Sequence, residues 1–305
     1  MLFVRFVEND FGLNDQGGFS MKLGILTGIW SIGKGMTLLD SLEKAAALGF
    51  RYVDLHGVFH AGPKHLPAEA RREIKSRMKT LGLTPRNYVL HSPHNPAGAS
   101  ASQLEESYRY LCEGIDMAAG WQIRQLMLNA GIWTFGIDRA KAWDQAAGFI
   151  RRVCDYASSR DLYIAQESEP YVWFLVNDIA STARMIEAVD RPNFTVLIDI
   201  GHMALAREGE GEFALLADRT IHAHLSDHEP LRHSNQVVGT GFTPCAQYLQ
   251  MLQKLEMDRR MKKFGYDELV ISFELGFPGD RIEDPDDWVL RSIQHIRNAA
   301  PFISL

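Results

Sequence analysis

The chain has 305 residues, 46% of them hydrophobic, and a formal net charge of −6 at pH 7. This composition allows a large core, and the negative charge gives no electrostatic case for a nucleic-acid partner. No apolar run approaches the ~18 residues of a membrane span. The three cysteines have no close spacing, so we expect a reducing, cytoplasmic environment and no disulfide framework.

Short apolar runs alternate with longer amphipathic stretches along residues 21–305, which we interpret as one domain. Residues 1–20 lack the apolar region of a signal peptide and are interpreted as an N-terminal extension. The predicted strands are residues 22–28, 52–57, 85–91, 124–130, 162–167, 195–200, 221–226 and 269–275. The predicted helices are residues 37–48, 67–81, 101–119, 139–159, 178–189, 211–217, 243–263 and 286–298. Eight strand–helix units in order predict an α/β protein, a single closed (β/α)8 TIM barrel rather than an open doubly wound sheet.

Four successive predicted strands in the second half each end near a carboxylate or an imidazole. These residues are Glu167, Asp199, His224 and Glu274. In a parallel barrel the carboxyl ends of the strands converge on one mouth, and charges buried there need partners. Taken singly, each acid could form a structural salt bridge inside the barrel. Together, two Glu, one Asp and one His predict a divalent-metal site, with Mn²⁺, Mg²⁺, Co²⁺ or Zn²⁺ as suitable ions.

The positions of the histidines point to the same face. Ten of the eleven lie at or just after a predicted strand end, and only His295 belongs to a predicted helix. The ten are His56, His60, His65, His91, His94, His202, His222, His224, His228 and His233. They predict a polar, metal-bearing or proton-handling mouth. His222 and His224 alternate to face the same side, so His224, nearer the mouth, is the better ligand and His222 fits a deeper core histidine.

The order Glu, Asp-x-x-His, His-x-x-Asp, Glu on these strands resembles the xylose-isomerase-like barrel superfamily, in its sugar isomerase/epimerase branch. The resemblance spans about residues 21–300 and includes KLGILTG, GFRYVDLHG, IDIGHM, HAHLSD and the turn Gly239-Thr240-Gly241. It implies one divalent metal ion, with Mn²⁺ as the first choice, bound by the four residues above. It also implies that Glu167 and Glu274 exchange a proton with a substrate carbon.

The resemblance further implies that His202 contacts a substrate oxygen. The arginine that the branch carries shortly after the ligand histidine has no clean match, because position 230 is proline and Arg232 is displaced. Aromatic and histidine side chains after the early strands could wall a sugar pocket, although packing is the alternative role for each aromatic. The predicted substrate-binding set is His202, His56, His91, Trp30, Trp133 and Arg232.

The implied function is a metal-dependent isomerase or epimerase that moves a proton α to the carbonyl of a ketose or keto-sugar. Its partners would be a small carbohydrate and further copies of the chain, as a dimer or tetramer, without nucleic acid or membrane. The alternative is a metal-dependent lyase, either an inosose- or dehydroshikimate-type dehydratase or an enzyme that cleaves 3-keto-glycosides.

Two more distant alternatives use the same barrel. An apurinic endonuclease would need an Asp-x-His pair after the seventh strand, where this chain has Leu231-Arg232-His233, and a net charge of −6 disfavours a grip on DNA. A non-enzymatic sugar-binding barrel would need a broken ligand set, whereas all four ligand positions are filled.

Overall fold

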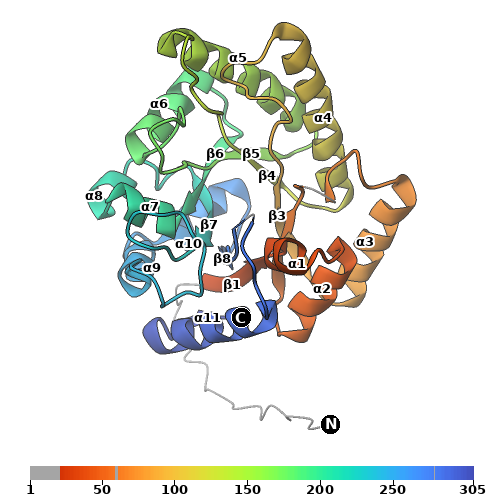
Figure 1. The fold of residues 1–305 in the computed structure, drawn as a ribbon, viewed down its shortest axis with the longest axis vertical. Helices are drawn as coiled ribbons and strands as arrows, with labels where there is room; N and C mark the ends of the chain where they lie inside the picture. The colour runs from red at the N-terminus through yellow and green to blue at the C-terminus, as the bar shows by residue number, and fades with distance from the viewer. Residues whose placement is uncertain (1–20, 59–60, 278) are drawn as a thin grey trace.

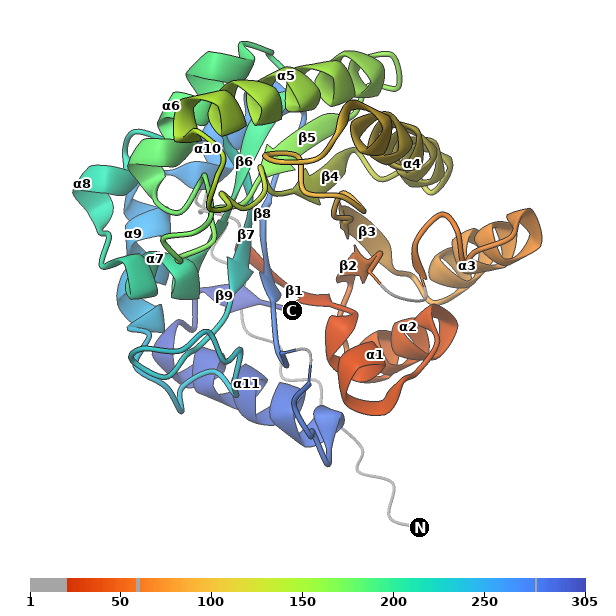
Figure 2. The ribbon, with the colours of Figure 1, turned by 45° about the horizontal axis from the view of Figure 1, so that its top comes forward.

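Eight parallel strands close into a barrel, and helices surround it (Figures 1 and 2). The computed structural model describes residues 21–58, 61–277 and 279–305, so the predicted extension at residues 1–20 and His60 lie outside the described residues. Each barrel strand pairs with the next along the chain, and β1 pairs with both β8 and β2 to complete the ring. The prediction of a single (β/α)8 barrel is confirmed.

The eight barrel strands agree closely with the predicted runs, whereas a ninth, short strand was not predicted. The strands are β1 (Met21–Leu26), β2 (Tyr52–His56), β3 (Thr84–Val89), β4 (Gln125–Leu128), β5 (Tyr163–Gln166), β6 (Phe194–Asp199), β7 (Thr220–Leu225), β8 (Leu269–Phe273) and β9 (Ile303–Ser304). The last of these, β9, adds a short pairing to the start of β1.

The helices lie mostly between the strands, as predicted. They are α1 (Gly28–Lys34), α2 (Leu38–Ala47), α3 (Ala68–Thr80), α4 (Ala101–Gly120), α5 (Arg139–Ser158), α6 (Ile179–Val189), α7 (Ile200–Ala206), α8 (Glu210–Phe213), α9 (Cys245–Lys254), α10 (Met257–Met261) and α11 (Pro285–Ala299), with a 3₁₀ turn η2 (Lys262–Phe264). None of the helices in the described ranges is both long and apolar enough to cross a membrane.

Several predicted helices differ from the structure. The helix predicted over residues 243–263 is broken because Glu256 adopts the left-handed backbone conformation, with φ of 50°, between α9 and α10. The helix predicted over residues 211–217 is only the short α8. The short helices α1 and α7 were not predicted, and His202 lies in α7, so His295 is not the only helical histidine. Asp199 starts α7 as its N-cap, accepting a hydrogen bond from the backbone N–H of His202.

The apolar side chains divide into two buried clusters. The larger one joins the strands to the surrounding helices. The smaller one contains only strand residues: Leu26, Val89, Met127, Ala165 and Leu197. Because no helix contributes to it, we place this cluster inside the barrel. Leu26 also lines a pocket at the carboxyl ends of the strands.

Candidate metal centre

The four predicted ligands meet at the carboxyl ends of strands β5 to β8. Glu167 follows β5 directly, Asp199 ends β6, His224 lies in β7 and Glu274 follows β8. Asp199 and His224 are also direct partners in the register of β6 and β7. One donor atom from each of the four residues lies within 4.8 Å of the others. Glu167, Asp199 and His224 are buried, whereas Glu274 is partly open to the pocket.

Each of these four side chains has one buried atom that could bind a metal ion and that has no hydrogen-bond partner. The atoms are Glu167 Oε1, Asp199 Oδ2, His224 Nδ1 and Glu274 Oε2. His224 Nδ1 lies 2.7 Å from Glu274 Oε2 and 3.3 Å from Glu167 Oε1, without the geometry of a hydrogen bond. Donors around an ion at about 2.1 Å are spaced roughly 3 Å apart. Because buried lone pairs that face one another repel, the set fits a divalent cation.

The other carboxylate oxygens of the predicted ligands Asp199 and Glu274 accept hydrogen bonds from neighbouring residues. Asp199 Oδ1 accepts hydrogen bonds from the His202 backbone N–H at 2.9 Å and from Ser226 Oγ at 2.5 Å. Glu274 Oε1 accepts one from Asn235 Nδ2 at 3.2 Å. These bonds orient the carboxylates so that only the second oxygen of each is left for an ion.

Two further residues lie below the centre, towards the barrel interior. Asp54 in β2 is fully buried, and its Oδ2 accepts hydrogen bonds from His222 Nε2 at 2.6 Å and His224 Nε2 at 3.1 Å. His222 is therefore a buried, hydrogen-bonded core histidine, as the alternation predicted. Asp54 was not singled out in the sequence, although a charged residue inside the apolar run Tyr52–His56 was a signal of a buried partner.

The titration behaviour of the ligands follows from their environments. Burial by itself would lower the pKa of His224, but the carboxylates of Asp54, Glu167 and Glu274 raise it well above its usual value. Burial raises the pKa of Glu167. For Glu274, the imidazole of His224 outweighs burial and lowers the pKa. The two glutamates thus lie in unequal electrostatic environments although both reach the same centre.

A pocket of about 550 Å³ opens beside the centre. Its polar lining consists of His56, His91, Asn129, Glu169, His233, Asn235 and Glu274. Its apolar lining includes Leu26, Ile32, Val58, Tyr171, Trp173, Phe174, Leu275 and Phe277. The volume falls within the range of small-molecule sites.

Burial moves the pKa values of several polar side chains in this lining. Burial lowers the pKa of His56 to about 4 and also lowers the pKa of His91, so both rings are neutral at pH 7. Glu169, which the sequence did not single out, has its pKa raised by burial to about 8. Neutral side chains of this kind suit hydrogen bonding to hydroxyl groups.

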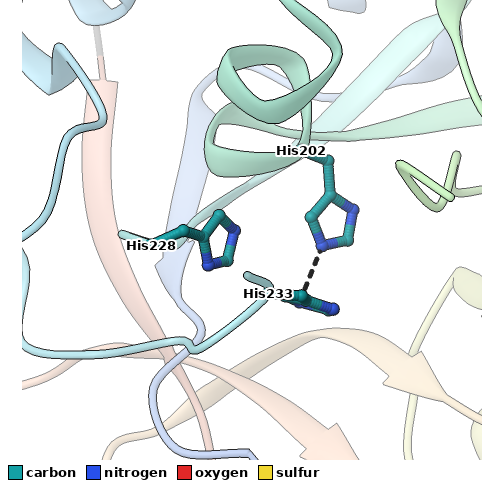
Figure 3. Close-up of side chains that lie close together, drawn as sticks. All are labelled: His202, His228 and His233. Carbon is teal, nitrogen blue, oxygen red and sulfur yellow. Dashed lines mark hydrogen bonds between the residues drawn. The ribbon is translucent and has the colours of Figure 1, made fainter. Parts of the chain in front are cut away.

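The predicted substrate-binding residues are only partly brought together. His56 and His91 line the pocket. His202 lies behind His233: its Nδ1 is 2.8 Å from the Ser168 carbonyl and its Nε2 is 3.0 Å from Nε2 of His233, which does line the pocket (Figure 3). The sequence did not single out His233 as a contact.

The other three predicted contacts lie outside the pocket lining. Trp30 is fully buried and donates from Nε1 to Asp286. Trp133 donates from Nε1 to the Ile137 carbonyl. Arg232 is exposed and lies 3.8 Å from carboxylates of Glu229 and Asp280. Their assignment to substrate stays a prediction.

Comparisons with known proteins agree with this fold. Solved structures with the same fold include a D-tagatose 3-epimerase-like protein, with 17% identity, 92% of this chain and 97% of that chain covered, and a TM-score of 0.72. D-psicose 3-epimerase from Clostridium cellulolyticum H10 is 17% identical to this chain, and the match covers 92% of this chain and 99% of the epimerase with a TM-score of 0.72. The IOLI protein with a bound zinc atom is 14% identical to this chain, and the match covers 92% of this chain and 98% of the IOLI protein with a TM-score of 0.74. At these identities the likeness establishes the fold.

A search of the curated proteins found no match. The family model described as the xylose isomerase-like TIM barrel matches residues 42–299, which is most of the chain. The protein therefore belongs to the xylose isomerase-like TIM barrel family.

Proposed function

We propose that the protein is a divalent-metal-dependent isomerase or epimerase that moves a proton at the carbon α to the carbonyl of a keto-sugar. The observation that carries this proposal is the set of four unpartnered donor atoms, from Glu167, Asp199, His224 and Glu274, at the side of the pocket. The neighbouring 3-epimerase structures and the zinc atom in the IOLI structure support it. Mn²⁺ is our first choice of ion, with Mg²⁺, Co²⁺ and Zn²⁺ as alternatives.

A bound divalent ion would polarise a carbonyl oxygen and acidify the adjacent C–H. Glu167 and Glu274 would then exchange the proton, since they reach the centre from different strands, β5 and β8. Removal by one carboxylate and return by the other inverts the carbon, which is epimerisation. Return of the proton to the neighbouring carbon gives aldose–ketose isomerisation instead.

The pocket lining supports an uncharged sugar as substrate. It contains no Arg or Lys among the described lining residues, so nothing there pairs with a phosphate group. His56, His91, Asn129 and His233 can donate to or accept from hydroxyl groups. The apolar wall, which includes Trp173 and Phe277, can cover the faces of a sugar ring.

A lyase is the second candidate, because the pocket lining includes a carboxyl group other than the two glutamates of the proposed metal centre. Glu169 lines the pocket together with Glu274, and proton exchange between Glu167 and Glu274 makes no use of it. A carboxyl group in that position could protonate a departing hydroxyl, which would convert proton removal into dehydration.

The test is NMR of ketoses, inososes and 3-keto-sugars incubated in D₂O with Mn²⁺-loaded protein, beside an EDTA-treated control. Metal-dependent deuterium uptake at a carbon α to the carbonyl, without loss of water, is the expected result and identifies the carbon. A new alkene or enol product would assign the protein to the lyases. Protein that binds no divalent ion in equilibrium dialysis would refute the metal-dependent mechanism.

A further inference from the structure

Three buried histidines, His202, His228 and His233, lie together beside the metal centre (Figure 3). Such a group could itself suggest a second metal site, but both nitrogens of His228 are already engaged. Its Nδ1 accepts hydrogen bonds from the backbone N–H groups of Ser234 and Asn235, each at 3.2 Å. Nδ1 therefore carries the lone pair and Nε2 carries the proton. His228 therefore has no nitrogen left for an ion, and its two nitrogens instead join neighbouring residues by hydrogen bonds.

Nε2 of His228 is connected to Asp199 by two successive hydrogen bonds through Ser226. Nε2 lies 2.9 Å from Ser226 Oγ and donates to it, and Ser226 Oγ donates in turn to Asp199 Oδ1 at 2.5 Å. His228 and Ser226 are fully buried, and Asp199 is 1% exposed. Asp199 Oδ1 also accepts from the His202 N–H. Both hydrogen bonds to this carboxylate therefore fall on Oδ1, and Oδ2 is left for the ion.

Nδ1 of His228 is connected to Glu274 through hydrogen bonds made by Asn235. The backbone of Asn235, with φ of 42°, lies in the left-handed region, where asparagine is tolerated better than most residues. Its N–H donates to His228, its carbonyl accepts from the Gly276 N–H at 2.7 Å, and its Nδ2 donates to Glu274 Oε1 at 3.2 Å. Asn235 is 2% exposed, so water does not compete for these bonds.

We propose that His228 is a positioning residue that holds two metal ligands in place at once, Asp199 through Ser226 and Glu274 through Asn235. The packing around it agrees with this role. A Cβ atom at Gly201 would lie 2.5 Å from His228 Nε2 and 2.3 Å from Ser226 Oγ, so only glycine leaves room for the connection. The inference rests on the proposed function only in requiring that the centre binds a divalent ion. It does not depend on the substrate.

The test measures Mn²⁺ affinity by competition with a fluorescent chelator, together with the visible absorption spectrum of bound Co²⁺. The variants are His228→Leu, Ser226→Ala and Asn235→Gly, and glycine is chosen at 235 because it tolerates the positive φ. Loss of residues that orient ligands typically costs about 10–100-fold in metal affinity. We expect a loss of this size for His228→Leu, smaller losses for the other two, and an altered Co²⁺ spectrum in all three.

A double-mutant cycle separates a shared connection from three independent effects. If His228 acts through Ser226, the Ser226→Ala change should cost less affinity in the His228→Leu background than in the wild type. Ser41→Ala removes a hydroxyl of similar burial, in α2, and should leave the affinity unchanged. If His228→Leu does not fold, as judged by circular dichroism, Ser226→Ala still tests the connection to Asp199 and Asn235→Gly still tests the connection to Glu274.

The outcomes distinguish the positioning role from the metal centre itself. Wild-type protein that binds neither Mn²⁺ nor Co²⁺ overturns the metal centre, and the positioning role with it. Wild-type binding with unchanged affinity and Co²⁺ spectrum in the folded variants overturns only the role of His228. Strictly multiplicative losses in the double mutant would also overturn it, because His228 and Ser226 would then act separately.

Discussion

Asp54 selects which nitrogen of His224 faces the proposed metal centre. Its Oδ2 accepts a hydrogen bond from His224 Nε2 at 3.1 Å, although the two residues are 170 positions apart in the chain. Because this bond holds a proton on Nε2, Nδ1 is the nitrogen that would offer its lone pair to an ion, and it points to the oxygens of Glu167 and Glu274. A carboxylate behind a ligand histidine also makes the imidazole a stronger donor.

Asp54→Asn should weaken metal binding while leaving the four ligands in the chain. The amide has no charge, so it holds the N–H groups of His222 and His224 less strongly and makes the His224 imidazole a weaker ligand. We expect Mn²⁺ affinity to fall about 10–100-fold, measured by titration of protein whose circular dichroism matches the wild type. Affinity equal to that of the wild type would show that Asp54 does not orient His224.

His224→Ala should remove most of the bound metal. The change deletes the only nitrogen donor of the four-residue centre and leaves three carboxylates facing one another. Metal content after dialysis against a limiting concentration of Mn²⁺ should fall from about one ion per chain to a small fraction. A metal content that stays at the wild-type value would remove His224 from the ligand set.

Glu274→Gln and Glu167→Gln should each abolish proton exchange while leaving the fold intact. An amide oxygen can still bind an ion, but it cannot take up or return a proton, so we expect turnover to fall by about 10²–10⁴-fold. The readout is deuterium uptake by NMR on a substrate found with the wild type. Glu229→Gln, at an exposed position on the loop after β7, is the matched control and should retain activity. Wild-type exchange in either site variant would exclude that glutamate from proton transfer.

Glu208 should make stability depend on pH. Its carboxylate accepts a hydrogen bond from the Ile179 N–H at 2.6 Å, yet burial outweighs this bond and raises its pKa from 4.5 to about 7. Because the folded-state value is the higher one, the stabilisation is fully present below pH 4.5 and is lost as the pH rises through about 7.

Glu208→Gln keeps a hydrogen-bond acceptor but does not titrate. The melting temperature of the wild type should therefore fall relative to that of the variant between about pH 5 and about pH 8. The difference in free energy of unfolding should stay below about 3 kcal/mol, because the side chain is partly exposed. Parallel curves of melting temperature against pH would contradict the shifted pKa.

Gly201→Ala should destabilise the protein and weaken metal binding, although alanine is the better helix former. The added Cβ would lie 2.3 Å from Ser226 Oγ and 2.7 Å from the Ser226 carbonyl, inside α7. Overpacking of this kind costs about 1–3 kcal/mol. Gly148→Ala, in α5 with open space around it, is the control and should stabilise by about 0.5–1 kcal/mol. Urea unfolding that shows both variants equally stable would mean that the site near Gly201 relaxes freely.

The fold and the meeting of the four candidate ligands at one place could be predicted from the sequence because both depend on local patterns. A buried parallel strand appears as a short apolar run, and a polar residue at its end marks the mouth of the barrel. Glu167, Asp199, His224 and Glu274 each follow this pattern. The break at Glu256 between α9 and α10 was missed because its left-handed backbone has no signal in the helical periodicity.

The sequence by itself determined the eight strand–helix units and the residues that meet at the mouth, because strand ends are local features. Only the tertiary structure decided which atoms of those residues are free. Asp54 reaches His224 across the barrel, Ser226 donates to Asp199 Oδ1, and Asn235 donates to Glu274 Oε1. His228 contacts both Ser226 and Asn235. It also placed Glu169 and His233 in the pocket lining and Arg232 outside it. Hydrogen bonds between distant strands and loops depend on how the barrel closes, and no pattern in a single strand records them.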